Sequence, residues 1–214
     1  MDVIDLSHTI TGSMPVYPGT EAPDISDATT ILRDGFAEKL LRFYSHTGTH
    51  IDAPAHMVSG ANTLDTLSIE NFMGPACVID VSPAKQGRIE VADIQAAVTA
   101  RTIEACDFVL LRSGWSAFWG HESYFADYPL LSEEAALWLS AFPLKGIGID
   151  MMSVDPIGSA NFPIHKILFR KGMLIVENLD NLARLDASGF GFSCLPLKFS
   201  DADGSPVRAC AFRV

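Results

Sequence analysis

The sequence lacks the features by which membrane proteins and nucleic-acid-binding proteins are recognised. No apolar run in its 214 residues approaches the roughly 20 that a helix needs to cross a bilayer. No lysine- or arginine-rich segment offsets the formal net charge of −11, so binding to phosphate backbones is not expected. The chain opens MDVIDLSHTI, without the basic start and apolar segment of a signal peptide. We therefore expect a protein that contacts neither a membrane nor a nucleic acid.

Cysteine is also scarce, and none of the four cysteines belongs to a CxxC pair. Cys77, Cys194 and Cys210 lie in apolar runs typical of strands, and Cys106 stands apart from them. This distribution predicts buried free thiols in a reducing cytoplasm. A catalytic or zinc-binding cysteine is the alternative, but no thiolate spacing supports it.

What the chain contains is typical of one folded domain that spans residues 1–214. Hydrophobic residues make up 48% of it and charged residues 19%, which argues against a disordered chain. Apolar runs recur along its length, and several are continuous and rich in β-branched residues, as in strands covered on both faces. The predicted strands are 3–7, 39–45, 75–82, 107–114, 146–153, 173–179, 192–199 and 207–214.

Helical patterns lie between these runs. Apolar residues recur at helical spacing in 91–105 and 132–142, and Ser132 before two acidic residues is typical of a helix start. The segment 163–171 begins with proline, which suits a first helical turn, and is followed by Gly172. Strands mixed with helices predict an α/β domain, and the strand-like runs at both termini favour a mixed sheet.

The segment HTGTHIDAPAH, residues 46–56, concentrates ionisable side chains at its even positions. These are His46, His50, Asp52 and His56. A helical pair of metal-binding histidines is disfavoured, because Gly48 and Pro54 are poor helix residues. In an extended chain, alternate residues face the same way, so the four side chains would share one face.

Two imidazoles and a carboxylate on one face suit a divalent ion such as zinc. An ideal strand would separate His46 from His50 by about 13 Å, whereas ligand bonds are only about 2 Å long. We therefore expect a bend, which Gly48 permits while leaving room for a metal. Pro54 is expected to turn the chain again and move His56 out of the ligand set. The alternatives are a strand end with satisfied polar residues and a non-catalytic metal site.

The same segment resembles the HxGTHxDxPxH signature of the cyclase family of metal-dependent hydrolases, which includes bacterial kynurenine formamidases and isatin hydrolases. The resemblance extends through MPVYPG, FMGPACVIDVS, LLRSGW, YPLLSEEAALWL and IHKILFRKGMLIVENLDNL. It implies an α/β fold of the swivelling β/β/α type, with a mixed, partly barrel-like sheet and peripheral helices. It also implies a homodimer or homotetramer, in which the N-terminal segment can reach a neighbouring subunit's site.

The resemblance assigns metal ligands residue by residue. The first two histidines and the aspartate of the signature bind metal, and here they are His46, His50 and Asp52. In family members with two ions, the aspartate bridges them, and a later histidine and glutamate complete the second site. The matching positions are His165 in FPIHKILF and Glu177 in LIVENL. One or two divalent ions are expected, with zinc as the first choice and manganese as the alternative.

Without the resemblance, the roles of these later residues stay open. His165 follows a loop rich in glycine, serine and asparagine, where an ordinary surface histidine is equally compatible. Glu177 ends an apolar strand and needs a partner, which could be a metal or an arginine such as Arg42 or Arg112. Asp150 and Asp155 flank MMSV and could either orient a ligand histidine or serve as turn residues.

Metal-assisted hydrolysis of an amide, formamide or lactam is the chemistry that this constellation predicts. The resemblance assigns the acid/base role to His56, whose ordinary pKa suits proton transfer near neutrality. Tyr17 in MPVYPG is the candidate substrate-binding residue, because it could stack on an aromatic substrate. The alternative is that this tyrosine only occupies a surface turn.

The expected substrate is a small aromatic amide, with N-formylkynurenine, which gives kynurenine and formate, as the first choice. A cyclic amide such as an isatin-like lactam or imide is the second. Formamidases of the family tend to have the sequence PGD where this chain has PGT, which ends at Thr20. They also tend to have EGL where this chain has ENL, with Asn178 in the middle. A non-catalytic metal- or small-molecule-binding protein is the alternative of another class, although it would not need a free histidine beside the ligands.

Overall fold

A mixed β-sheet forms the centre of the computed structural model, which describes residues 2–82 and 87–213. Within these ranges, nine strands pair in the order β1-β13-β11-β5-β7-β9-β10-β4-β12. In that order they span Asp2–Asp5, Cys210–Arg213, Ser188–Ser193, Met73–Asp80, Phe108–Arg112, Gly146–Ile149, Leu174–Glu177, His50–Asp52 and Gly204–Pro206. The four central strands from β5 to β10 are parallel, and the remaining pairs are antiparallel. The predicted mixed sheet is therefore confirmed.

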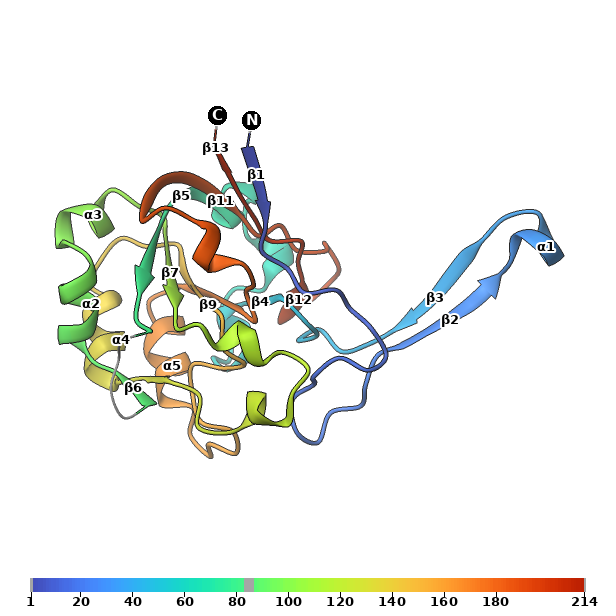
Figure 1. The fold of residues 1–214 in the computed structure, drawn as a ribbon, viewed down its shortest axis with the longest axis horizontal. Helices are drawn as coiled ribbons and strands as arrows, with labels where there is room; N and C mark the ends of the chain where they lie inside the picture. Colours follow the sequence, from blue (N-terminus) through green and yellow to red (C-terminus); the bar gives the residue numbers. More distant parts are fainter. Residues whose placement is uncertain (1, 83–86, 214) are drawn as a thin grey trace.

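Successive side chains of the central strands point to opposite faces of the sheet, and each face has its own core. Ile79 points toward a core shared with α2 (Val91–Ala97), α4 (Glu133–Leu139) and α5 (Pro163–Phe169). Val78 points into the second core, which also contains side chains of β11 and β13 because the sheet curls on itself. Figure 1 shows α2, α4 and α5 gathered on one side of the sheet. This arrangement agrees with the expected peripheral helices and partly barrel-like sheet.

The predicted helices are present, with one correction. Ser132 caps α4 by accepting a hydrogen bond from the amide of Ala135 at 3.1 Å, as expected from the sequence. The single helix predicted for 91–105 is wrong, because the segment forms α2 and a separate α3 (Ala100–Glu104). Val98 between them is extended, and the Thr99 side chain caps α3. The break follows from two consecutive β-branched residues, the second of which is a favoured N-cap.

The strand predicted for 192–199 is also wrong beyond Ser193, where β11 ends. Pro196 makes only an isolated bridge to Val207, because a proline has no amide hydrogen to donate to a ladder. Val214, the last residue of the final predicted strand, lies outside the described residues. A second parallel pair, β6 (Arg88–Ile89) with β8 (Leu130–Leu131), stands apart from the main sheet.

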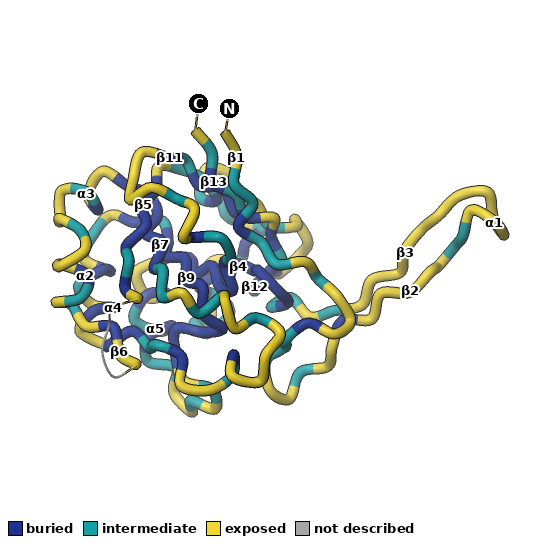
Figure 2. Tube along the Cα trace, viewed as in Figure 1, coloured by how far each residue is buried: buried dark blue, intermediate teal, exposed yellow. Residues whose placement is uncertain are grey.

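An antiparallel hairpin projects from the body of the molecule, as Figure 1 shows. It comprises β2 (Asp24–Thr29), the short α1 (Ile31–Asp34) and β3 (Glu38–Arg42), and we call residues 24–42 the arm. The strand predicted for 39–45 is present as far as Arg42, where β3 ends, and every residue of β3 is exposed. Figure 2 shows this contrast with the buried central strands. The exposed apolar side chains of the arm are Ile25, Ile31, Leu32, Phe36, Leu40 and Leu41.

None of the helices in the described ranges is both long enough and apolar enough to cross a bilayer.

Candidate metal centre

The centre of the candidate site is the short strand β4, which lies between β10 and β12. His50 and Asp52 are two residues apart on it, so both point to the same face. The antiparallel register places Glu177 of β10 directly opposite His50, and its side chain therefore joins theirs. Sheet register thus brings together a glutamate and a histidine that are far apart in the sequence.

The residues before and after β4 reach the site through bends. Only three residues of the segment are extended, and Gly48 turns the chain with a φ of +65°. The prediction that Gly48 makes room for a metal is wrong, because an added Cβ would instead lie 3.3 Å from the Ile10 side chain. After the bend, Nδ1 of His46 lies 2.6 Å from Oδ1 of Asp52. Pro54 begins a 3-10 turn, as the predicted second bend requires, and this turn places His56 beside His46.

His165 enters the site from the first turn of α5, and Asp155 fixes its orientation. The Asp155 carboxylate accepts hydrogen bonds from the amides of Ile164 and His165 at 3.1 and 3.0 Å. Its Oδ2 also accepts from Nδ1 of His165 at 2.6 Å, which leaves Nε2 facing the cluster. Asp155 is therefore the carboxylate that orients a histidine, whereas Asp150 binds the amides of Ser113 and Gly114 in a turn.

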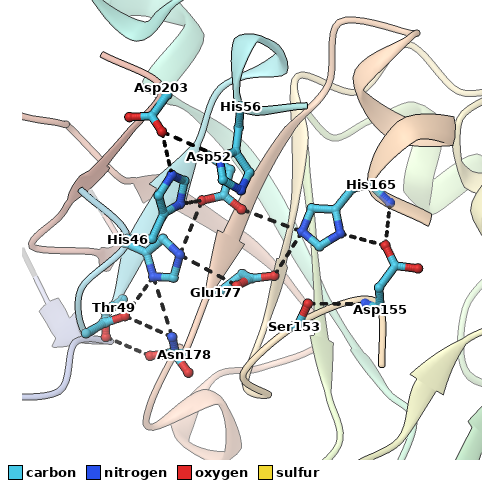
Figure 3. A network of polar contacts seen from close by, with 12 residues as sticks. His46, Thr49, Asp52, His56, Ser153, Asp155, His165, Glu177, Asn178 and Asp203 are labelled. Carbon is cyan, nitrogen blue, oxygen red and sulfur yellow. Dashed lines mark hydrogen bonds and ion pairs between the residues drawn. The ribbon is translucent and has the colours of Figure 1, made fainter. Parts of the chain in front are cut away.

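Asp52 and Glu177 lie between two histidines, and each carboxylate presents one oxygen to either side (Figure 3). Nε2 of His50 is 3.2 Å from Oδ1 of Asp52 and 3.5 Å from Oε2 of Glu177. Nε2 of His165 is 3.9 Å from Oδ2 of Asp52 and 3.5 Å from Oε1 of Glu177. Nδ1 of His50 donates to the carbonyl of Gly48 at 2.8 Å, so Nε2 is the atom left for a ligand.

The electrostatics of the cluster call for an added cation. Although burial opposes it, His46 and His50 hold the pKa of Asp52 well below its usual value. Burial and the nearby Asp52 charge raise the pKa of Glu177. Its Oε1 is buried and makes no hydrogen bond to the described residues. Arg42 and Arg112, the other partners considered for Glu177, pair with Glu21 and Asp80 instead. Within the described residues, Glu177 therefore has only the imidazoles of His50 and His165 as nearby partners of opposite charge, and a bound metal ion would further reduce the cost of burying its carboxylate.

The donors fall into three overlapping sets, of which the set of His46, His56 and Asp203 is the most exposed and the other two contain the ligands predicted from the sequence. His46, His50 and Asp52 offer ligand atoms within 4.8 Å of one another, and so do Asp52, His165 and Glu177. Imidazole nitrogen with carboxylate oxygen is a combination that zinc and manganese accept. Asp52 belongs to both of these sets, so the arrangement has room for one ion or for two ions that share it.

His56 lies beside these sets, and its ring stands 3.9 Å from that of His46, centroid to centroid. Burial, reinforced by the nearby His46, lowers the pKa of His56. His56 opens onto a pocket of about 430 Å³. Tyr17, Thr20, Tyr44, Met57, Met152, Phe162 and Asn178 line this pocket together with the cluster. The hydroxyl of Tyr17 accepts a hydrogen bond from the amide of Gly158 at 3.0 Å, which ties Tyr17 to the loop that precedes α5.

Two polar residues of the site were missed from the sequence. Asp203, just before β12, lies 3.1 Å from Nε2 of His46 through its Oδ2. Asn178, next to Glu177, donates to the carbonyl of Gly48 at 2.9 Å and accepts from the Tyr124 hydroxyl at 2.6 Å. Its φ of +58° is a conformation that asparagine tolerates better than most residues, and a glycine in the family's EGL pattern would adopt it freely. The departure from the family's glycine could therefore have drawn attention to Asn178. No feature of the sequence around Asp203 indicates a role in the site.

Comparison with known sequences places the chain among enzymes. The family model described as "Putative cyclase" matches residues 4–156. A kynurenine formamidase of Bacillus cereus is 33% identical over 212 residues, which cover 96% of this chain and 95% of the relative. A kynurenine formamidase of Geobacillus thermodenitrificans is 32% identical over 207 residues, with the same coverage of both chains.

Comparison with solved structures gives the same family. Isatin hydrolase A from Ralstonia solanacearum superposes with a TM-score of 0.85 at 27% identity, and covers 98% of this chain and 91% of that one. A structure described as a potential metal-dependent hydrolase with cyclase activity gives a TM-score of 0.80 at 30% identity, covering 98% and 96%. The predicted family and fold are confirmed.

Proposed function

The chain belongs to the cyclase family, and from this premise we propose that it is a metal-dependent hydrolase of C–N bonds that cleaves an aromatic formamide. N-formylkynurenine, which yields kynurenine and formate, is the first substrate. The observation that carries the proposal is the arrangement at β4, where two donor sets share Asp52 and His56 stands beside them. The names of its relatives agree with this reaction class.

In this proposal His46, His50 and Asp52 hold one divalent ion, and Asp52, His165 and Glu177 hold a second where two are bound. Zinc is the first choice and manganese the second, because both accept mixed nitrogen and oxygen ligands. When bound, such an ion lowers the pKa of a coordinated water and polarises the substrate carbonyl. Hydrogen bonds from His50 to Gly48 and from His165 to Asp155 keep both ligand histidines oriented.

His56 is the acid/base group of the proposed reaction. Because burial lowers its pKa, its imidazole is neutral near pH 7 and able to accept a proton from the attacking water. As the carbonyl carbon to nitrogen bond breaks, His56 returns that proton to the leaving amine. Its side chain is 27% exposed and faces the pocket, so substrate can reach it. A protein that only stored metal would have no use for this neutral histidine beside the ligands.

The pocket fits an aromatic substrate. Its volume of about 430 Å³ lies in the range of small-molecule sites. Tyr17, Phe162 and Met152 contribute apolar surface to its lining. We assign Tyr17 to substrate binding, because its ring is held in place by the hydrogen bond between its hydroxyl and Gly158.

A cyclic amide of the isatin type is the second candidate substrate. Two observations favour keeping it. The solved structures with high TM-scores include isatin hydrolases. Thr20 and Asn178, the two positions at which the chain departs from the formamidase patterns, both line the pocket. Neither position is itself a proposed metal donor, although the Asn178 side chain also contacts the Gly48 carbonyl and Nδ1 of His50.

We also propose that the protein assembles as a homodimer or homotetramer through the arm. A two-stranded hairpin is marginally stable by itself, and this one carries the fully exposed Leu32 and the exposed Phe36. Packing against a second copy would cover both side chains. Light scattering should give at least twice the chain mass of 23.1 kDa, and Leu32→Asp with Phe36→Asp should reduce it. A monomeric wild-type protein would exclude this assembly.

The cysteines support a location in the cytoplasm. All four are free thiols in the structure, and Cys77, Cys106 and Cys194 are buried. Burial raises the pKa of the Cys106 and Cys210 thiols, which keeps them protonated and unreactive. Reduced thiols of this kind are the state that the cytoplasm maintains.

The decisive experiment measures kynurenine release from N-formyl-L-kynurenine by the purified protein, loaded with zinc or manganese and compared with a chelated sample. Metal-dependent turnover with a kcat/KM of about 10⁴ M⁻¹s⁻¹ or more is the expected result. A metal-loaded protein that leaves this compound intact but opens isatin would transfer the assignment to cyclic amides. Binding of metal without turnover of either compound would contradict the proposal.

A further inference from the structure

Asp203 stands at the edge of the site but belongs to neither of the two donor sets proposed for metal. Its Oδ2 lies 3.1 Å from Nε2 of His46 and 3.5 Å from Nδ1 of His56 (Figure 3). One carboxylate oxygen therefore faces both imidazoles, whose rings lie 3.9 Å apart. The two histidines have different roles in the proposed function, so a group that touches both is placed to couple them.

The backbone around Asp203 is tied to β4, which fixes the origin of its side chain. The carbonyl of Asp203 accepts a hydrogen bond from the amide of Ala53 at 2.9 Å, and the next residue, Gly204, pairs with Asp52 in the ladder. A Cβ at Gly204 would lie 2.4 Å from Cε1 of His46, so only glycine permits this close approach. The same strand register that assembles the metal donors thus also presents Asp203.

The geometry separates Asp203 from the buried donors. Its side chain is 44% exposed, whereas that of Asp52 is 2% exposed. His46 turns Nδ1 toward Asp52 and Nε2 toward Asp203, so the two carboxylates lie at opposite nitrogens of one ring. His46 can therefore offer Nδ1 to a metal while its Nε2–H donates to Asp203, which is the usual relation between a ligand histidine and an outer carboxylate.

We propose that Asp203 is a positioning residue that fixes the orientation and tautomer of His56. A neutral imidazole carries one hydrogen, and a carboxylate oxygen near Nδ1, as in the 3.5 Å ion-pair contact of Asp203 with His56, favours the form that is protonated there. Nε2 then keeps its lone pair and becomes the atom that exchanges protons with water and the leaving amine. Carboxylates hold the histidines of hydrolytic triads in the same way. The inference rests on the proposed acid/base role of His56.

The kinetic test compares Asp203→Asn with Asp201→Asn in the same metal-loaded protein. The asparagine can both donate and accept, so it no longer selects one tautomer of His56. We expect kcat on N-formyl-L-kynurenine to fall by about 10–100-fold, with KM and bound metal close to wild type. Asp201 is exposed in the same loop, and its φ of +56° suits asparagine, so its variant should match wild type.

Two kinetic outcomes would overturn the inference. Loss of bound metal in Asp203→Asn would mean that Asp203 acts on the metal site, either as a ligand with His46 and His56 or through its hydrogen bond with His46, rather than on the tautomer of His56. An unchanged kcat would make it a surface carboxylate without influence on His56, and a rise in KM alone would place its effect on substrate binding rather than on proton transfer.

A spectroscopic test does not depend on knowing the substrate. Nitrogen-15 NMR of the zinc-loaded protein, with His56 assigned by comparison with His56→Gln, reports which ring nitrogen carries the hydrogen. We expect Nδ1 to be protonated in the wild type and a tautomer mixture in Asp203→Asn. Protonation at Nε2 in the wild type would overturn the inference even if the variant failed to fold. If the wild-type protein is inactive on the formamide but its His56 is protonated at Nδ1, the proposed substrate is wrong. The inference that Asp203 positions His56 then still stands.

Discussion

The metal centre and the arm are both built around short antiparallel strands, yet they are held in opposite ways. Asp52 on β4 is 1% exposed and is surrounded by groups from β10, α5 and the loop before β12. Leu32 at the tip of the arm is 99% exposed and belongs to a hairpin whose strands, within residues 2–82 and 87–213, pair only with each other. A strand that is fixed from both sides can position ligand atoms to fractions of an ångström, whereas one fixed only by its partner strand presents a surface.

The largest expected difference between the two regions concerns Asp52. Asp52→Asn should abolish metal binding at both sets and lower turnover by at least about a thousandfold, since a bound metal contributes several kcal/mol. Asp27→Asn on β2 is the matched control, because its exposed ion pair with Lys39 is worth little. Metal content by mass spectrometry and kcat/KM should change in the first variant only. Equal losses in both would remove the contrast between the regions.

His56 tests whether the site contains a group that acts without binding metal. His56→Ala should keep its metal and lower kcat by about 10²–10⁴-fold, the usual contribution of a general acid/base group. The measurement pairs metal analysis with steady-state kinetics on the same sample. If metal content falls together with activity, His56 is a ligand and the roles assigned within the cluster must be exchanged.

A substitution of Asp155 tests whether a residue that only orients a ligand histidine affects metal binding. Asp155→Ala removes the acceptor at Nδ1 of His165 and two amide contacts at the start of α5. Metal affinity should fall by about 10–100-fold, as read by competition with a chromogenic chelator. The matched control is Asp150→Ala, which removes an equally buried carboxylate that contacts Ser113 instead. Weakened metal binding in the control would show that lost stability, not lost orientation, is the cause.

The smallest expected effect is the change in the free energy of unfolding of the monomer when a side chain of the arm is shortened. Leu32→Ala should change the free energy of unfolding by less than about 0.5 kcal/mol, because the residue contacts little within its own chain. Phe108→Ala in the second core removes a fully buried ring that packs against Phe192, and should cost about 3–5 kcal/mol. Urea denaturation at low protein concentration measures both. A large loss for Leu32→Ala under those conditions would mean that the arm is not free within the monomer.

The sequence predicts most of the site, because the signature places several donors within eleven residues. His50 and Asp52 share a face as their spacing requires, and Glu177 joins them from an apolar strand that needed a partner for its charge. Asp203 was not predictable, because its contact with His46 depends on how β12 pairs with β4, 157 residues along the chain. Local spacing carries no information on such a register.

The exposure of the arm is not predictable from the sequence for a related reason. The run at 39–45 forms a strand as far as Arg42, but its composition does not say which segments pack against it. In 91–105 the helical period continues through Val98 and Thr99, although one helix ends there and Thr99 caps the next. In both segments, periodicity gives the type of element, and local capping or the neighbouring segments decide the rest.

One hydrogen bond, from the amide of Gly158 to the hydroxyl of Tyr17, joins a pocket-lining residue to a second loop, so this part of the lining is held by loops. The metal donors instead come from β4, its bends, β10 and α5. Mutations can therefore accumulate in the loops without moving a donor atom. Proteins with this architecture can change their amide substrate during evolution while they keep the same hydrolytic chemistry. The presence of both formamidases and isatin hydrolases among the relatives agrees with this separation of loops from donors.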